Sequence, residues 1–154
     1  MSHPDETRLA IACSEAMHAR DDAAQALGIE LLESTPGRAR LAMTVEPRMT
    51  NGHDVCHGGV LFTLADTAFA HACNNRNRIT VAAAASIQFL APGRVGERLV
   101  ATAFERSRGK RTGVYDVEIH NPKGELIALF RGNAHQIRGQ LVPDPESPEG
   151  DPSA

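Results

Sequence analysis

"HGGVLFTLADTAFAHACN" (residues 57–74) is the stretch of this 154-residue sequence that decides its fold. Five of its apolar residues recur at helical spacing and would form one stripe: Leu61, Leu64, Ala65, Ala68 and Ala72. Phe62, Phe69 and Cys73 make this apolar stripe wider. This spacing predicts an α-helix of about 19 residues, from His57 to about Asn75, or ~28 Å in length. A helix that is apolar on most sides has to be buried.

Strand-like stretches lie on both sides of this helix. Before it come "LGIELLES" (27–34) and "RLAMTVE" (40–46), and in the second Leu41, Met43 and Val45 alternate with the other residues. After it come "ITVAAAASIQFLA" (79–91), "RLVATAFERS" (98–107), "TGVYDVEIHN" (112–121) and "ELIALFRGNAHQI" (125–137). Because turn residues separate these last four, we expect them to pair in sequence as a meander. The prediction is an α+β fold, with an antiparallel sheet wrapped around one long central helix.

The chain has the length of one ordinary domain with one core, which we assign to residues 27–138. Residues 1–26 are rich in Ala, Glu and Arg, which predicts one or two short helices packing on that domain. Residues 139–154 are rich in Pro and acidic residues, which predicts a disordered tail.

Composition excludes several classes of protein. A net charge of −3 argues against a nucleic-acid partner. No apolar run reaches the ~20 residues of a membrane span, and "MSHPDETRLA" lacks the features of a signal peptide. The number and spacing of Cys13, Cys56 and Cys73 are typical of reduced thiols. We therefore expect a soluble, cytoplasmic protein.

Asp66 is the one carboxylate in the apolar run, where a charge is costly unless something requires it. Gly58 and Gly59 stand at the predicted start of the same helix. The first turn of a helix offers free backbone N–H groups and a partial positive charge, and glycine lets a substrate approach that backbone closely. A carbonyl placed there would be polarised, and a negative charge developing on its oxygen would be stabilised.

The pattern of Asn51, then His57-Gly58-Gly59, then Asp66 resembles the hot-dog-fold acyl-CoA thioesterases, and among them the phenylacetic acid degradation (PaaI) group. "IQFLAPG", "GKRTGVYDVEI" and "ALFRG" resemble the same group, so the likeness covers residues 27 to 137. The resemblance implies a hot-dog fold and hydrolysis of acyl-CoA without metal or cofactor. It also implies an aromatic acyl group, such as phenylacetyl or a ring-hydroxylated phenylacetyl.

The resemblance also implies roles for four catalytic residues. The N–H of Gly58 would stabilise the oxyanion, and His57 would anchor the loop or orient the thioester. Asn51 would hold the attacking water or the thioester. Asp66 would act as base or as nucleophile, and both roles profit from a carboxylate with little water around it.

Substrate binding is expected at two further places. "RSRGKR" (106–111) puts cations in a predicted hairpin turn, and the resemblance assigns coenzyme A contacts to this turn and to the "FLAPGR" stretch. The expected binding residues are Gly59, Thr67, Phe89, Pro92, Arg94, Arg108, Gly109, Lys110 and Arg111. Ala82–Ala85 departs from the pattern, because some relatives carry there a Ser or Thr that touches the substrate.

A homodimer, often doubled to a dimer of dimers, is also implied. The small, apolar stretch "VAAAASIQFLA" is suited to pair with its copy, because an exposed edge strand tends to find a partner. The resemblance places Asp66 of one subunit opposite Asn51 and Gly58 of the other.

Other interpretations of the same residues remain open at this stage. Asp66 could be a structural carboxylate paired with an Arg or a backbone N–H. Cys56 beside His57 could be a nucleophile, and with His53 the two could bind zinc, although no fourth ligand or standard spacing is present. At the level of function, the rivals are a hot-dog enoyl-CoA hydratase or dehydratase and a non-catalytic acyl-CoA-binding module.

Overall fold

The computed structural model describes residues 3–143. In chain order the elements are α1 (Pro4–Arg20), α2 (Asp22–Ala26), β1 (Glu30–Thr35), β2 (Arg38–Thr44), the 3-10 turn η1 (Pro47–Met49), α3 (Gly58–Asn74), β3 (Thr80–Phe89), β4 (Arg98–Arg108), β5 (Thr112–His120) and β6 (Leu126–Gln136). The long central helix and the strands that flank it are therefore confirmed. No helix among the described residues has the length and apolar character needed to span a membrane.

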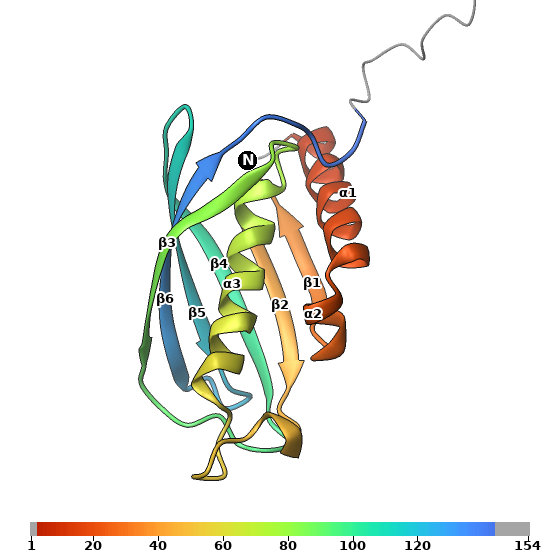
Figure 1. Cartoon of the computed structure of the whole chain (residues 1–154). Helices are drawn as coiled ribbons and strands as arrows, with labels where there is room; N and C mark the ends of the chain where they lie inside the picture. The colour runs from red at the N-terminus through yellow and green to blue at the C-terminus, as the bar shows by residue number, and fades with distance from the viewer. Residues whose placement is uncertain (1–2, 144–154) are drawn as a thin grey trace, which may run out of the picture.

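The six strands form one antiparallel sheet that curves around α3 (Figure 1). Their order is β1-β2-β4-β5-β6-β3, so the predicted meander is correct for β4–β6 and wrong for β3. β3 pairs with β6 at the far edge of the sheet. The reason is that residues 90–97 are no tight turn: they pass beneath the start of α3, where the Cys56 amide donates to the Gly93 carbonyl at 2.7 Å.

The core lies between α3 and the concave face of the sheet. Leu64, Ala68 and Phe69 of α3 are fully buried against strand residues. The Phe69 ring occupies the space over Gly132 of β6, where an added Cβ would come within 2.8 Å of it. Such small residues let the sheet approach the helix closely, which is how a sequence poor in aromatics fills its core.

β3 is one of the two edge strands of the sheet, and most of its residues are exposed. It is the last strand of the sheet, and residues 81–86 are exposed. Its apolar members Val81 and Phe89 are 43% and 55% exposed. An exposed edge of this kind is a ready template for pairing with another chain.

The N-terminal helices pack beside β1 and α3 (Figure 1). Ala10 and Cys13 of α1 are buried, and the hydroxyl groups of Ser14 and Ser34 lie 2.8 Å apart. At the other terminus, Asn77 Oδ1 accepts hydrogen bonds from the amides of Leu141 and Val142, so ordered contacts extend past residue 138. Residues 144–154 of the predicted tail lie outside the described part of the chain.

Candidate active site

The loop before α3 is closed by His57, which is the N-cap of the helix. Its ring Nδ1 accepts a hydrogen bond from the Gly59 N–H at 2.9 Å, and its backbone N–H donates to the Met49 carbonyl at 2.8 Å. A ring nitrogen that accepts carries no proton, so the neutral ring has its proton on Nε2. The predicted anchoring role of His57 therefore has a geometric basis.

Gly58 holds the one unpartnered amide in the first turn of α3. The N–H of Gly59 is capped by His57 Nδ1, and the N–H groups of Val60 and Leu61 donate to the His57 carbonyl at 2.9 and 3.1 Å. Within residues 3–143 the Gly58 N–H donates no hydrogen bond. This donor stands at the positive end of the helix, where it can stabilise a developing negative charge.

Asp66 lies two turns further along α3 and is half-buried. Within the part of the chain that the structure describes, its carboxylate has neither an ion pair nor a hydrogen bond, which removes support for a structural pairing there. Burial, and secondarily the charge of Asp21, raises the pKa of Asp66. A carboxylate that is partly desolvated and unpaired is suited to act as a base or a nucleophile.

Asn51 shapes the loop that precedes the helix. Its side-chain Oδ1 accepts hydrogen bonds from the backbone N–H of His53 at 2.9 Å and of Val55 at 3.5 Å. The backbone N–H of Asn51 donates to the Val55 carbonyl. The side-chain oxygen is thus occupied, whereas the side-chain NH2 group has no acceptor among residues 3–143. That group is the part of Asn51 able to hold a water molecule or a carbonyl.

Three of the predicted binding residues lie at this same end of α3. The link after β3, which carries Pro92 and Arg94, is held against the loop by the Cys56–Gly93 hydrogen bond. Pro92 and Arg94 are exposed, and the Phe89 ring lies directly against Gly58. The chain thus brings together residues that are more than thirty positions apart in sequence.

The predicted basic turn lies at the opposite end of α3. Arg108, Gly109, Lys110 and Arg111 join β4 to β5 and line a cavity of about 40 Å³ beside Cys73, near the last residue of the helix. The 17-residue helix is ~25 Å long, so within one chain this turn is remote from Gly58. The structure therefore divides the predicted binding residues into two groups.

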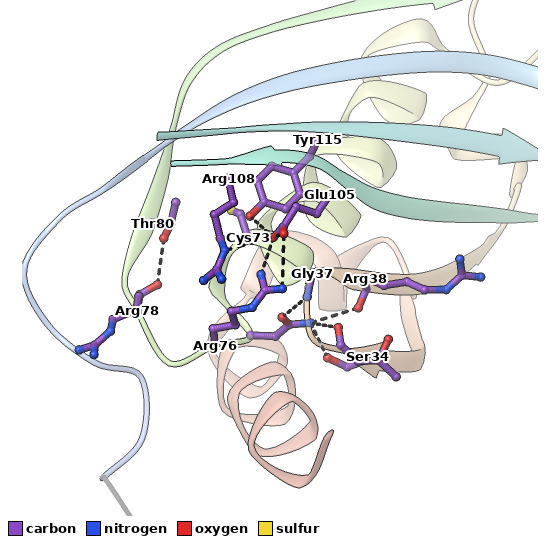
Figure 2. A network of polar contacts seen from close by, with 12 residues as sticks. Ser34, Gly37, Arg38, Cys73, Arg76, Arg78, Thr80, Glu105, Arg108 and Tyr115 are labelled. Carbon is purple, nitrogen blue, oxygen red and sulfur yellow. Dashed lines mark hydrogen bonds and ion pairs between the residues drawn. The ribbon is translucent and has the colours of Figure 1, made fainter. Parts of the chain in front are cut away.

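Two cations of this cavity were missed by the sequence reasoning. Arg76 and Arg78, from the loop between α3 and β3, line it together with the basic turn. Arg76 is committed to an ion pair with Glu105, which also accepts a hydrogen bond from the Tyr115 hydroxyl at 3.0 Å (Figure 2). Arg78 has no ion pair within residues 3–143. The "NNRNR" run at residues 74–78 was the available signal.

Thr67 and Gly59 are the two remaining predicted binding residues, and Thr67 is not hydrogen-bonded to its neighbour Asp66. Its hydroxyl donates to the Thr63 carbonyl at 2.6 Å, one turn earlier, and the side chain is buried. Gly59 is exposed, but its N–H is used by His57. Of the two helix glycines, only Gly58 therefore has a backbone donor to offer.

The alternative chemistries find little support in this geometry. Burial raises the pKa of Cys56 to about 11, so its thiol stays protonated at neutral pH and is a poor nucleophile. Within the described residues, no three His, Cys, Asp or Glu side chains are placed to hold a metal ion. A hydratase needs an Asp–His or Glu–His pair at the active helix, and no His within residues 3–143 is hydrogen-bonded to Asp66.

Comparison with known proteins identifies the family. Residues 53–128 match the family model of the thioesterase superfamily. The acyl-coenzyme A thioesterase PaaI of Escherichia coli is 51% identical over 129 residues, covering 84% of this chain and 92% of that protein. Human acyl-coenzyme A thioesterase 13 is 33% identical over 110 residues, covering 70% of this chain and 79% of its own.

Solved structures agree with the sequence comparison. The structure of E. coli PaaI, from the phenylacetic acid degradation operon, superposes with a TM-score of 0.86 at 49% identity, covering 87% of this chain and 97% of that one. A Streptococcus pneumoniae thioesterase crystallised with coenzyme A gives a TM-score of 0.70 at 25% identity, covering 73% of this chain and 87% of that one. The predicted hot-dog fold is thereby confirmed, and the chain belongs to the thioesterase superfamily.

Proposed function

We propose that this protein is an acyl-CoA thioesterase that hydrolyses aromatic acyl-CoA, of the phenylacetyl or ring-hydroxylated phenylacetyl type, to the free acid and coenzyme A. The name of the E. coli relative supports the reaction, and the operon of that relative supports the acyl class. The observation that carries the proposal is the Gly58 N–H, left free at the positive end of α3 while its neighbours are capped.

In the proposed reaction the thioester carbonyl oxygen accepts a hydrogen bond from the Gly58 N–H. The carbonyl carbon is attacked either by the Asp66 carboxylate or by a water molecule from which Asp66 takes a proton. The negative charge that develops on the oxygen is stabilised by Gly58 until the carbon–sulfur bond breaks. In the base route the leaving thiolate takes the proton that Asp66 removed from water. In the nucleophile route the thiolate takes a proton from solvent, and a water molecule then hydrolyses the Asp66–acyl anhydride to the free acid and the Asp66 carboxylate. Asn51, through its unused NH2 group, positions the water or the thioester.

We propose that each site is shared between two subunits. Asp66 follows Gly58 by eight residues, which places it about 12 Å further along the helix axis at ~1.5 Å per residue. The carbon of a thioester carbonyl has to lie about 3 Å from the attacking atom, and its oxygen about 3 Å from the oxyanion donor. A second copy, related by a two-fold axis, supplies the missing Asp66.

The exposed edge of β3 is the surface proposed to join the two copies. β3 starts beside the loop that carries Arg78 and ends at Phe89, against Gly58. Antiparallel pairing of β3 with its copy therefore brings the start of one strand beside the end of the other. By family resemblance, this dimer doubles to a dimer of dimers in the cytoplasm.

This pairing also gives the basic turn a role. In this dimer, the cavity lined by Arg78, Arg108, Lys110 and Arg111 of one subunit would lie near the Gly58 end of the partner's α3. Arg78, Lys110 and Arg111 have no ion pairs within the described residues, so they are free to bind the phosphates of coenzyme A. The thioester would then occupy one subunit's Gly58 while the nucleotide rests on the other subunit.

The experiment that tests the function measures free thiol release from a panel of acyl-CoA thioesters. Phenylacetyl-CoA and hydroxyphenylacetyl-CoA should be hydrolysed with a higher kcat/KM than aliphatic acyl-CoAs of similar size. Hydration of an enoyl-CoA without thiol release would establish the hydratase instead. Saturable binding of the whole panel without turnover would establish a binding module.

A further inference from the structure

The backbone at residue 58 does not itself require glycine. Gly58 is the first residue of α3, and it is not among the glycines with positive φ. Helical conformation is open to every L-residue there, and a helix by itself favours alanine over glycine. The reason for glycine at this position must therefore be sought in what surrounds its Cα.

Phe89 occupies the space into which a side chain at residue 58 would point. A Cβ added to Gly58 would lie 3.0 Å from the Phe89 Cζ and 3.3 and 3.4 Å from the two Cε atoms. The tip of the aromatic ring is thus seated on the Gly58 Cα. In the same loop, a Cβ on Gly52 would meet nothing within 4 Å.

The ring is fixed in this place from the backbone. The residue after Phe89 donates its amide to the Ile127 carbonyl at 2.9 Å, and the Cys56–Gly93 hydrogen bond secures the following link to the loop of Gly58. In the single chain Phe89 is nonetheless 55% exposed, so packing in the core of its own subunit does not account for the contact with Gly58. The contact of an exposed aromatic ring with the residue that holds the free amide needs its own explanation.

We propose that Phe89 is a positioning residue for the Gly58 N–H. The ring fixes the first turn of α3 and shields one side of its backbone, so that the free amide keeps its direction toward the thioester carbonyl. A donor contributes most to catalysis when it is held in place beforehand and water is kept away. The inference deepens the proposed function and rests on it, because the reaction supplies the oxyanion that Gly58 binds.

A double-mutant cycle of Gly58→Ala and Phe89→Leu tests the proposal. Gly58→Ala should lower kcat by on the order of 10²-fold, because the new methyl displaces the ring and the first turn together. Phe89→Leu alone should lower kcat about tenfold, because the first turn loses the ring that fixes it. In the double variant the missing ring tip leaves room for the new methyl, so kcat should recover by about tenfold over Gly58→Ala alone. KM should change much less than kcat in all three variants.

Two controls and a second readout separate positioning from stability. Gly52→Ala adds a methyl where a Cβ meets nothing within 4 Å, and Val95→Ala truncates another exposed apolar side chain in the link after β3, so both should retain wild-type kcat. The same cycle read by thermal unfolding shows whether the contact exists, independently of any substrate. Coupling in both kcat and melting temperature supports the proposal. Coupling in melting temperature alone makes Phe89 merely structural and overturns it, as does additivity in both.

The two levels of the proposal fail in different ways. If wild-type protein releases no thiol from any thioester, the proposed function is overturned and the positioning role with it. If wild-type protein is active but Phe89→Leu fails to relieve the Gly58→Ala defect in kcat, only the positioning role is overturned.

Discussion

Asn75, just past the C-terminal end of α3, and Gly58, at its N-terminal end, use their polar groups in opposite ways. At the C-terminal end, the buried Asn75 side chain donates to Ser34 Oγ and to two backbone carbonyls, and accepts from the Gly37 amide at 3.0 Å. At the N-terminal end, the Gly58 N–H has no acceptor among residues 3–143, and Asp66 in mid-helix has no partner there either. Figure 2 shows the same kind of saturation around Glu105, where Arg76 and Tyr115 converge.

The difference indicates which polar groups hold the fold and which are available for chemistry. Buried polar groups in proteins are almost always hydrogen-bonded, because leaving one unpaired is costly. A fully bonded asparagine is therefore explained by stability alone. An unpaired amide and an unpaired carboxylate on the same helix need another explanation, and binding of a substrate supplies one.

The largest expected effect concerns the unpaired carboxylate of Asp66. Asp66→Asn keeps the shape of the side chain and removes its charge and basicity, so kcat should fall by about 10²–10⁴-fold. Because no partner within residues 3–143 is lost, the melting temperature should not fall. Thiol-release kinetics and thermal unfolding measure the two quantities. Hydrolysis near the wild-type rate would mean that Asp66 is not part of the reaction.

A mixing experiment tests whether Asn51 of one subunit and Asp66 of the other belong to the same active site. Asn51→Ala and Asp66→Asn should each be inactive alone. After unfolding and refolding in equal amounts, about half of the dimers should be mixed, and one of the two sites in each should be intact. Activity should thus return to roughly a quarter of the wild-type value. Mixed dimers that are confirmed by mass and remain inactive would show that each site is built within one chain.

Asn75→Ala tests whether the fully hydrogen-bonded Asn75 side chain stabilises the fold. It removes the partner of the buried Ser34 hydroxyl, of two partly buried backbone carbonyls and of the buried Gly37 N–H, so the free energy of unfolding should fall by about 3 kcal/mol. The kcat of the protein that remains folded should be unchanged. Asn133→Ala is the matched control, since Asn133 is exposed and has no side-chain hydrogen bond in the described part of the chain. Chemical denaturation measures both variants, and equal losses would remove the distinction.

The basic cavity lies at the same end of α3 as Asn75, but it contains cations that have no ion pair within residues 3–143. Neutralising Lys110 and Arg111 should raise KM for an acyl-CoA about tenfold. KM for a short thioester without nucleotide phosphates should change much less. Arg98→Gln removes an exposed charge that is paired with Glu30 and serves as the control. Equal effects on the two substrates would argue against a phosphate site.

The smallest expected effect concerns pH. The pKa of Asp66 is raised by burial, so the folded state holds this proton more tightly than the unfolded chain. The resulting stabilisation is present below the unfolded pKa and is lost as pH rises through the folded one. Relative to Asp66→Asn, wild-type protein should therefore gain stability as the solution is acidified, while kcat/KM falls over the same range. Denaturation and rate profiles against pH measure both.

Sequence patterns were sufficient for the elements and for the local motif at the start of α3. The apolar spacing of residues 57–74 predicted α3 to within a residue at each end, because a buried helix imposes its period on its own residues. The motif around His57 and Gly58 was equally local, since a cap and a first turn are made by neighbours in the chain. Asp66 stood out because a lone carboxylate in an apolar run is visible without coordinates.

Only the tertiary structure decided which distant parts meet. It placed β3 beside β6 rather than β4, because strand pairing depends on where the link of residues 90–97 crosses, and no single stretch encodes that path. It brought Phe89 onto Gly58 and moved the basic turn to the other end of α3. The sequence by itself determined which groups could do chemistry, whereas long-range packing determined which of them remain unpaired and therefore free to do it.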